Sequence, residues 1–145
     1  MVKEMRQFVN LYQHSEYTML GCAIKTERLV AAAVEAGYDA LAITDLNNMH
    51  GALKFYRACR RARIKPIIGL CVACDSADNF DNRLLLYAIG EFGYKNLLVI
   101  ASRAKIKGSV DLEFLRKHSF DLIAVLPGEE SEIVKLYREG AEKKA

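Results

Sequence analysis

Long apolar runs, a targeting signal and a strong net charge are all missing from this 145-residue sequence. No apolar stretch reaches the ~18 residues that a membrane span needs. The first residues, MVKEMRQ, lack the apolar core of a signal peptide. We therefore expect a cytoplasmic protein with no membrane partner. The net charge of +3 is too weak to indicate nucleic-acid binding by itself.

Common catalytic motifs are also missing. The sequence has no Walker-type phosphate loop, no G-x-S-x-G, no H-E-x-x-H and no carboxylate cluster of the kind that two-metal nucleotidyl transfer needs. We therefore assign no catalytic residue. The four cysteines are expected to be reduced thiols in the cytoplasm. Cys71 and Cys74 have C-x-x-C spacing, but residues three apart on a strand face opposite ways, so we expect their thiols to diverge.

Short apolar runs alternate with helical patterns along the whole chain. Strands are predicted at 8–12, 40–44, 66–72, 84–88 and 122–126, and helices at 26–36, 48–59, 93–104, 111–117 and 131–139. Thr26 and Asn48 are the expected helix caps, and Gly37 is expected to end the first helix. The polar segment 75–82 is predicted to be a loop.

Alternating strands and helices predict an α/β fold with a parallel sheet buried on both faces. Periodicity alone does not separate an open doubly wound sheet from part of a barrel. In either fold, chemistry is expected at the C-terminal ends of the strands. Those ends are 12–14, 45–48, 71–74 and 90–92.

Four stretches carry a resemblance to a known family: FVNLYQHSEYTML at 8–20, ALAITDLNNMHGALKFYRACRRARIKPIIG at 40–69, GYKNL at 93–97 and DLIAVLPGEESEI at 121–133. They resemble the PHP (polymerase and histidinol phosphatase) domain of bacterial polymerase III alpha subunits. The resemblance implies the first part of a PHP-type (β/α)7 barrel. It also implies that residues 1–145 are the N-terminal portion of a single PHP domain, with the rest of the barrel and the polymerase domains absent.

Active members of this family hold two or three metal ions with His, Asp and Glu at the strand ends. The family's H-x-H-S motif reads Tyr12-Gln13-His14-Ser15 here, its T-D-H reads Thr44-Asp45-Leu46, and Cys71 stands at the acidic position after I-I-G. The resemblance therefore implies six vestigial metal-site positions. These positions are Asn10, Tyr12, His14, Asp45, Leu46 and Cys71.

One imidazole cannot hold several ions that each need about three ligands. We therefore expect a metal-free site that does not hydrolyse phosphate esters. His14 stays a weak candidate for binding a lone ion with Asp45 or Cys71. Asp45 is otherwise expected to cap the following turn, accepting N–H bonds from Asn47 or Asn48.

The densest charge cluster is basic, and its members are Lys54, Arg57, Arg60, Arg61, Arg63 and Lys65. Such a cluster can contact DNA phosphates or an acidic partner surface. It is more typical of the solvated outer face of a barrel helix, because no aromatic residues interleave to stack bases.

The resemblance implies a parent enzyme, a DNA-directed DNA polymerase that uses Mg and works with a sliding clamp and a proofreading exonuclease. In related alpha subunits the PHP domain docks that exonuclease, so we expect a non-enzymatic scaffold here, with DNA bound through the parent. The alternatives are a metal-dependent PHP phosphoesterase or 3'-5' proofreading exonuclease with an altered metal site, and a stand-alone binding protein. A half barrel would also leave sheet edges and an apolar face uncovered, so we expect the chain to self-associate.

Overall fold

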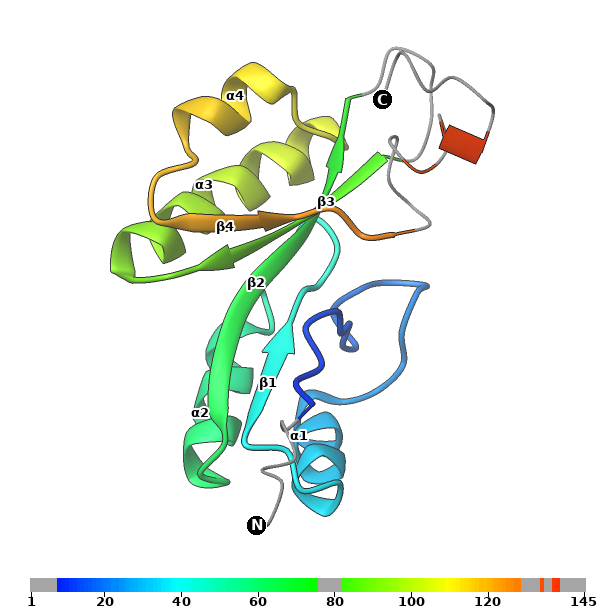
Figure 1. The fold of residues 1–145 in the computed structure, drawn as a ribbon, viewed down its shortest axis with the longest axis vertical. Helices are drawn as coiled ribbons and strands as arrows, with labels where there is room; N and C mark the ends of the chain where they lie inside the picture. The colour runs from blue at the N-terminus through cyan, green and yellow to red at the C-terminus, as the bar shows by residue number, and fades with distance from the viewer. Residues whose placement is uncertain (1–7, 76–81, 129–133, 135–136, 139–145) are drawn as a thin grey trace, which may run out of the picture.

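A computed structural model describes residues 8–75, 82–128, 134 and 137–138. The elements in chain order are α1 (Thr26–Glu35), β1 (Ala40–Ile43), α2 (Ala52–Arg61), β2 (Lys65–Cys74), β3 (Asn82–Ala88), α3 (Glu91–Lys107), α4 (Leu112–Lys117) and β4 (Leu122–Val125) (Figure 1). Most of the predicted loop 75–82 and most of the predicted helix 131–139 lie outside the described residues. No helix in the described part of the chain is long and apolar enough to cross a membrane.

The four strands form one mixed sheet in the order β1-β2-β3-β4. β1 and β2 are parallel, with Ala40 opposite Lys65. β2 and β3 are antiparallel, with Gly69 opposite Tyr87, and β4 is antiparallel to β3. The prediction of an all-parallel sheet is therefore wrong. Only residues 75–81 connect β2 to β3, and that is too short for the crossover of a dozen or more residues that parallel strands need.

The predicted strand at 8–12 is also not formed, although the segment does lie beside β1. Ala42 N–H donates to Asn10 O (3.2 Å) and Thr44 N–H donates to Gln13 O (2.8 Å). The N–H of Gln13, however, donates to the Thr44 hydroxyl at 3.0 Å. A side chain thus takes the place of a backbone carbonyl, and the ladder is interrupted.

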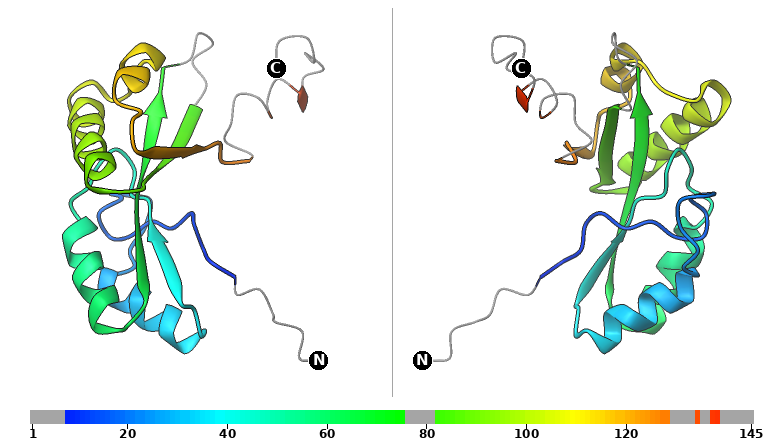
Figure 2. Two further views of the ribbon diagram at one scale, coloured as in Figure 1. Left: turned by 60° about the vertical axis from the view of Figure 1, so that its left-hand side comes forward. Right: turned by 90° about the vertical axis from the view of Figure 1, so that its right-hand side faces the viewer.

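The helices lie on one side of the sheet (Figure 2). α1 and α2 pack over β1 and the start of β2, in a core that includes Leu29, Ile43 and Phe55. α3 and α4 pack over the rest of β2 and over β3, around Val72 and Ile100. The other face carries a smaller buried cluster of Ala42, Cys71, Leu85 and Tyr87. The prediction that both faces are buried therefore fails for β4, where Ile123 is 53% exposed.

The helix ends match the sequence signals only in part. Gly37 has φ +73° just after α1, as expected for a glycine that ends a helix. Thr26 is inside α1 rather than at its cap, and its buried Oγ1 has no hydrogen-bond partner in the described structure. Asn48 lies before α2 and accepts from His50 N–H (3.2 Å) without capping that helix. Asp111 does cap α4, by accepting from Phe114 N–H at 2.7 Å.

Candidate functional site

Asp45 lies two residues after the end of β1 and is almost completely buried, with 3% of its surface exposed. Its Oδ1 accepts from Ser15 N–H (2.6 Å) and the Thr18 hydroxyl (2.9 Å), and its Oδ2 accepts from the Ser15 hydroxyl (2.7 Å). A carbon added to Gly51 would lie only 3.1 Å from Oδ2. The carboxylate is thus enclosed and anchors the 15–18 segment. The prediction that it caps the turn at Asn47 or Asn48 is wrong.

The turn after Asp45 is instead held by Asn47, which adopts φ +52°. Its backbone N–H donates to Cys71 O (2.8 Å), while its side chain accepts from Ala73 N–H (2.9 Å) and donates to Gly108 O (2.8 Å). Asparagine tolerates this left-handed conformation better than most residues. One amide therefore ties the end of β1 to β2 and to the end of α3.

A pocket of about 580 Å³ lies beside this turn, and we call it the strand-end pocket. It contains Tyr12, His14 and Leu46 from the vestigial positions, but Asn10, Asp45 and Cys71 do not line it. The other lining residues are Gln13, Thr18, Met19, Leu20, Gly21, Cys22 and Arg83. The structure therefore brings three of the six predicted positions to one pocket and directs the other three elsewhere.

His14 is half-buried, and the edge of its ring packs against Tyr12, with the centroids 5.1 Å apart. Its Nδ1 is buried and has no hydrogen-bond partner among the described residues. A histidine that binds a metal through one ring nitrogen normally donates the other N–H to a carbonyl, carboxylate or water. Nδ1 of His14 makes no such orienting contact within the described residues.

The remaining vestigial residues serve local structure. The Asn10 side chain donates to Gln13 Oε1 (2.9 Å) and accepts from Tyr12 N–H (3.2 Å). Cys71 is fully buried between Leu85 and Tyr87, whereas Cys74 belongs to the cluster on the opposite face. The C-x-x-C thiols therefore diverge, as predicted. Burial, with smaller contributions from Cys71 and Asp75, raises the pKa of Cys74 to about 11.

The donor set gives little support for a metal centre. Within residues 8–75 and 82–128, no three His, Cys, Asp or Glu side chains are grouped so that they could hold an ion. The Asp45 carboxylate is hydrogen-bonded to Ser15 and Thr18, and Leu46 offers no atom that could bind a metal ion. The described residues do not fit the metal cluster that the resemblance implies.

The basic cluster is divided in two by the structure. Lys54 forms ion pairs with Glu16 (2.9 Å) and Glu27 (3.0 Å). The hydrogen bond to Glu16 contributes most, and the one to Glu27 next, to raising the pKa of the Lys54 ammonium group. The other five members are exposed on and after α2: Arg57, Arg60, Arg61, Arg63 and Lys65. Lys54 is therefore paired with carboxylates of its own chain, and the other five residues of the cluster are available to a partner.

Two kinds of site residue were missed from the sequence. Ser15 and Thr18 bind the buried carboxylate, and the serine of the H-x-H-S motif was the available signal for Ser15. Arg83 lines the strand-end pocket because β3 runs antiparallel to β2, with Arg83 opposite Ala73. The same reversal places 90–92 beyond the end of β3 that lies beside Gly69, whereas the other end of β3 lies beside Cys74. The expectation that 90–92 join the other strand ends is therefore wrong.

Comparison with known proteins agrees with the resemblance. The PHP domain family model matches residues 10–145. The chain is 40% identical over 137 residues to DNA polymerase III subunit alpha of Bacillus subtilis, covering 92% of this chain and 12% of that protein. It is 37% identical over 145 residues to the subunit from Buchnera aphidicola, covering 94% of this chain and again 12% of the relative. The chain thus spans a small part of these relatives.

Two solved structures share the fold at low sequence identity. An amidohydrolase from Chromobacterium violaceum, with sulfate bound and no metal, matches 68% of this chain and 34% of its own, with a TM-score of 0.53 and 20% identity. A Bifidobacterium adolescentis protein named as a metal-dependent phosphoesterase matches 96% of this chain and 52% of its own, at TM-score 0.53 and 12% identity. These matches support an α/β fold of PHP type with a mixed sheet. The chain belongs to the PHP domain family.

Proposed function

We propose that this chain is a degenerate, metal-free PHP module that acts as a scaffold in a replicative DNA polymerase. On this proposal residues 1–145 are the N-terminal portion of the PHP domain, and template-directed DNA synthesis with Mg takes place in other domains of the parent. The observation that carries the proposal is the lining of the strand-end pocket, where His14 alone keeps a ligand type among Tyr12, His14 and Leu46.

A metal cluster needs carboxylate oxygens that are open to the ions they bridge. The two Asp45 oxygens already accept three hydrogen bonds from Ser15 and Thr18. Leu46 and Cys71 stand where the family has ligands, and Cys71 is completely buried. Asp45 therefore anchors the 15–18 segment, and His14 alone keeps a ligand type among the residues at the family's ligand positions.

The scaffold role rests on the relatives, which are named DNA polymerase III subunit alpha. We propose that the module docks the proofreading exonuclease subunit and that the sliding clamp and DNA are reached through the parent. The exposed arginines on and after α2 are the proposed contact with an acidic surface of the partner. Charge reversal with Arg60→Glu and Arg61→Glu should then weaken exonuclease binding, while the matched reversal Lys105→Glu on α3 should not.

Metal content is the test that separates the scaffold from an enzyme. Elemental analysis of the purified chain, after equilibration with Zn²⁺ or Mn²⁺ and dialysis, should show well under one ion per chain. A variant with ligand types restored at two residues that line the strand-end pocket, Tyr12→His with Leu46→His, serves as the positive control and should retain metal. Stoichiometric metal in the unmodified chain, lost together with a phosphatase or nuclease activity, would instead support a metal-dependent phosphoesterase or 3'-5' exonuclease.

A further inference from the structure

The turn between α2 and β2 holds an arginine in a backbone conformation that favours glycine. Arg63 N–H donates to Arg60 O at 3.3 Å, and Ile64 N–H donates to Cys59 O at 3.0 Å. This pair of bonds is the Schellman motif that commonly ends a helix. Arg63 occupies the left-handed position of the motif, with φ +58°. A residue with a Cβ atom is strained in that conformation, so Arg63 makes the turn less stable than glycine would.

The turn after α1 has the same motif with the favoured residue. Gly37 N–H donates to Val34 O at 3.0 Å, and Tyr38 N–H donates to Ala33 O at 2.9 Å. Gly37 occupies the left-handed position with φ +73°. The two helices therefore end in the same way, but α2 has a strained residue where α1 has glycine. A residue that keeps a strained backbone conformation is a candidate for a functional role.

The residues around the α2–β2 turn form an exposed surface of cations, which we call the arginine surface. Its members are Arg57, Arg60, Arg61, Arg63 and Lys65. None of these five side chains forms an ion pair within the described residues. Arg60 and Arg61 already lie in the last turn of α2, where the helix dipole favours positive charge. Arg63 is therefore not required for that stabilising contact, and its charge is available to a partner.

The arginine surface lies away from the strand-end pocket and from the helix-free face of the sheet. Figure 1 shows the α2–β2 turn at the end of the molecule where β1 and β2 begin. The strand-end pocket is lined by Leu46, which follows the other end of β1. Figure 2 shows α2 on the side of the sheet that the helices cover. Strands added at the edges of the sheet would leave this surface exposed, so an external partner can reach it.

We infer that Arg63 is a specificity-determining residue of the arginine surface, which binds a partner segment rich in carboxylates. The inference rests on the proposed function and deepens it, because it names a residue that recognises the acidic partner. The backbone bond between Arg63 and Arg60 holds these two residues close together, so one acidic segment can contact both. A guanidinium group binds a carboxylate through two parallel hydrogen bonds. The net charge of +3 gives little of the attraction on which binding to DNA phosphates depends.

Arg63→Gly separates the stability of the turn from the binding of the partner. In the full chain it should raise the midpoint of thermal unfolding by about 3 °C, because glycine relieves the left-handed strain. It should also raise the dissociation constant of an oligoglutamate peptide about threefold at low salt, as expected for one exposed ion pair. Arg63→Lys is the matched control, because it keeps both the positive charge and the strained backbone. Its midpoint should not change, and its affinity for the peptide should stay within about twofold.

Fluorescence anisotropy of the labelled peptide and thermal unfolding of each variant give the two readouts. An Arg63→Gly midpoint that does not rise would overturn the inference, as would an affinity for the peptide that is absent in the unmodified chain or does not fall in this variant. Tighter binding of a DNA duplex than of the peptide would also overturn it, by assigning the surface to nucleic acid. The proposed docking of the exonuclease is tested separately with Arg60→Glu and Arg61→Glu, so its failure would appear in a different measurement.

Discussion

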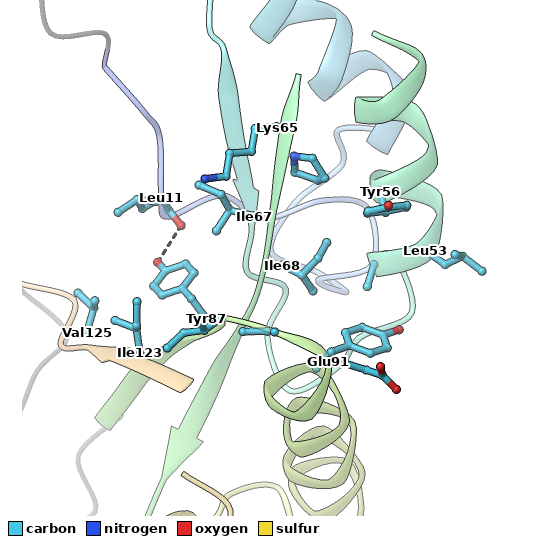
Figure 3. Close-up of a pocket in the computed structure, with 16 residues that line it drawn as sticks. Leu11, Leu53, Tyr56, Lys65, Ile67, Ile68, Tyr87, Glu91, Ile123 and Val125 are labelled. Carbon is cyan, nitrogen blue, oxygen red and sulfur yellow. Dashed lines mark hydrogen bonds between the residues drawn. The ribbon is translucent and has the colours of Figure 1, made fainter. Parts of the chain in front are cut away.

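Two cavities differ in how far their side chains are hydrogen-bonded or buried within the chain. One is the strand-end pocket, and the other is a larger apolar groove of about 900 Å³ between β2, α2, α3 and β4 (Figure 3). Beside the pocket, Asp45 is buried and each of its oxygens accepts hydrogen bonds from Ser15 or Thr18. In the groove, Leu53 and Ile123 are open to solvent. The polar groups that could perform chemistry therefore hold the fold together. Exposed apolar surface remains in the groove, where no catalytic group lies. This difference supports the proposed role of the chain in binding a partner protein.

Removal of the Asp45 carboxylate should give the largest effect. Asp45→Ala leaves one backbone N–H and two hydroxyls without their acceptor in a buried place, and we expect the free energy of unfolding to fall by about 4 kcal/mol. Thr18→Val removes one of these contacts and the acceptor of Leu46 N–H (3.1 Å), so its expected loss is about 1–2 kcal/mol. Urea unfolding followed by circular dichroism measures both.

The same variants distinguish a structural carboxylate from a metal ligand. If Asp45 were held in place for catalysis, its removal would relieve a buried charge and change stability little. An Asp45→Ala protein as stable as the unmodified chain would therefore contradict the contrast between the two cavities. A loss for Asp45→Ala larger than for Thr18→Val would support it.

A smaller effect on stability is expected from the two buried thiols, which also separates a structural role from metal binding. Burial raises the pKa of Cys59 from its ordinary 9.0 to about 11, and that of Cys74 to the same value. Because both thiols stay protonated in the folded chain, their contribution is complete below pH 9 and is lost as the pH rises toward 11. We expect each thiol to lower the free energy of unfolding, measured in reductant, by about 2 kcal/mol between pH 8 and pH 11.

The double variant Cys59→Ala/Cys74→Ala provides the control for this pH dependence. Its free energy of unfolding should change less between pH 8 and pH 11 than that of the unmodified chain. Thiols that served as metal ligands would have lowered pKa values. A free energy of unfolding that rose with pH below pH 9, and no longer did so in the double variant, would argue for that role.

The positions of most elements could be predicted from the sequence, because they depend on local patterns. The apolar run 40–44, the helix ended by Gly37 and the strand of 122–126 all have their own signals within a few residues. The PHP family was recognised from motifs such as T-D-x-x-N and I-K-P-I-I-G, and the family model confirms it.

The directions of the strands and the partners of Asp45 could not be predicted in the same way. β3 is antiparallel to β2 because residues 75–81 form a short connection, and apolar runs carry no information on strand direction. Asp45 bonds to Ser15 and Thr18, about thirty residues away in sequence, whereas the turn rule considers only neighbours such as Asn47. Arg83 reached the strand-end pocket through the same unpredicted pairing.

The metal-free state of the strand-end pocket is tested most directly by thermal unfolding of the unmodified chain with Mn²⁺ and with EDTA. An ion that binds only the folded chain raises its stability, by about 2.7 kcal/mol at a hundred times the dissociation constant. We predict the same midpoint in both solutions. A midpoint that rises with Mn²⁺, returns with EDTA and no longer responds to Mn²⁺ in the His14→Ala variant would contradict the proposal.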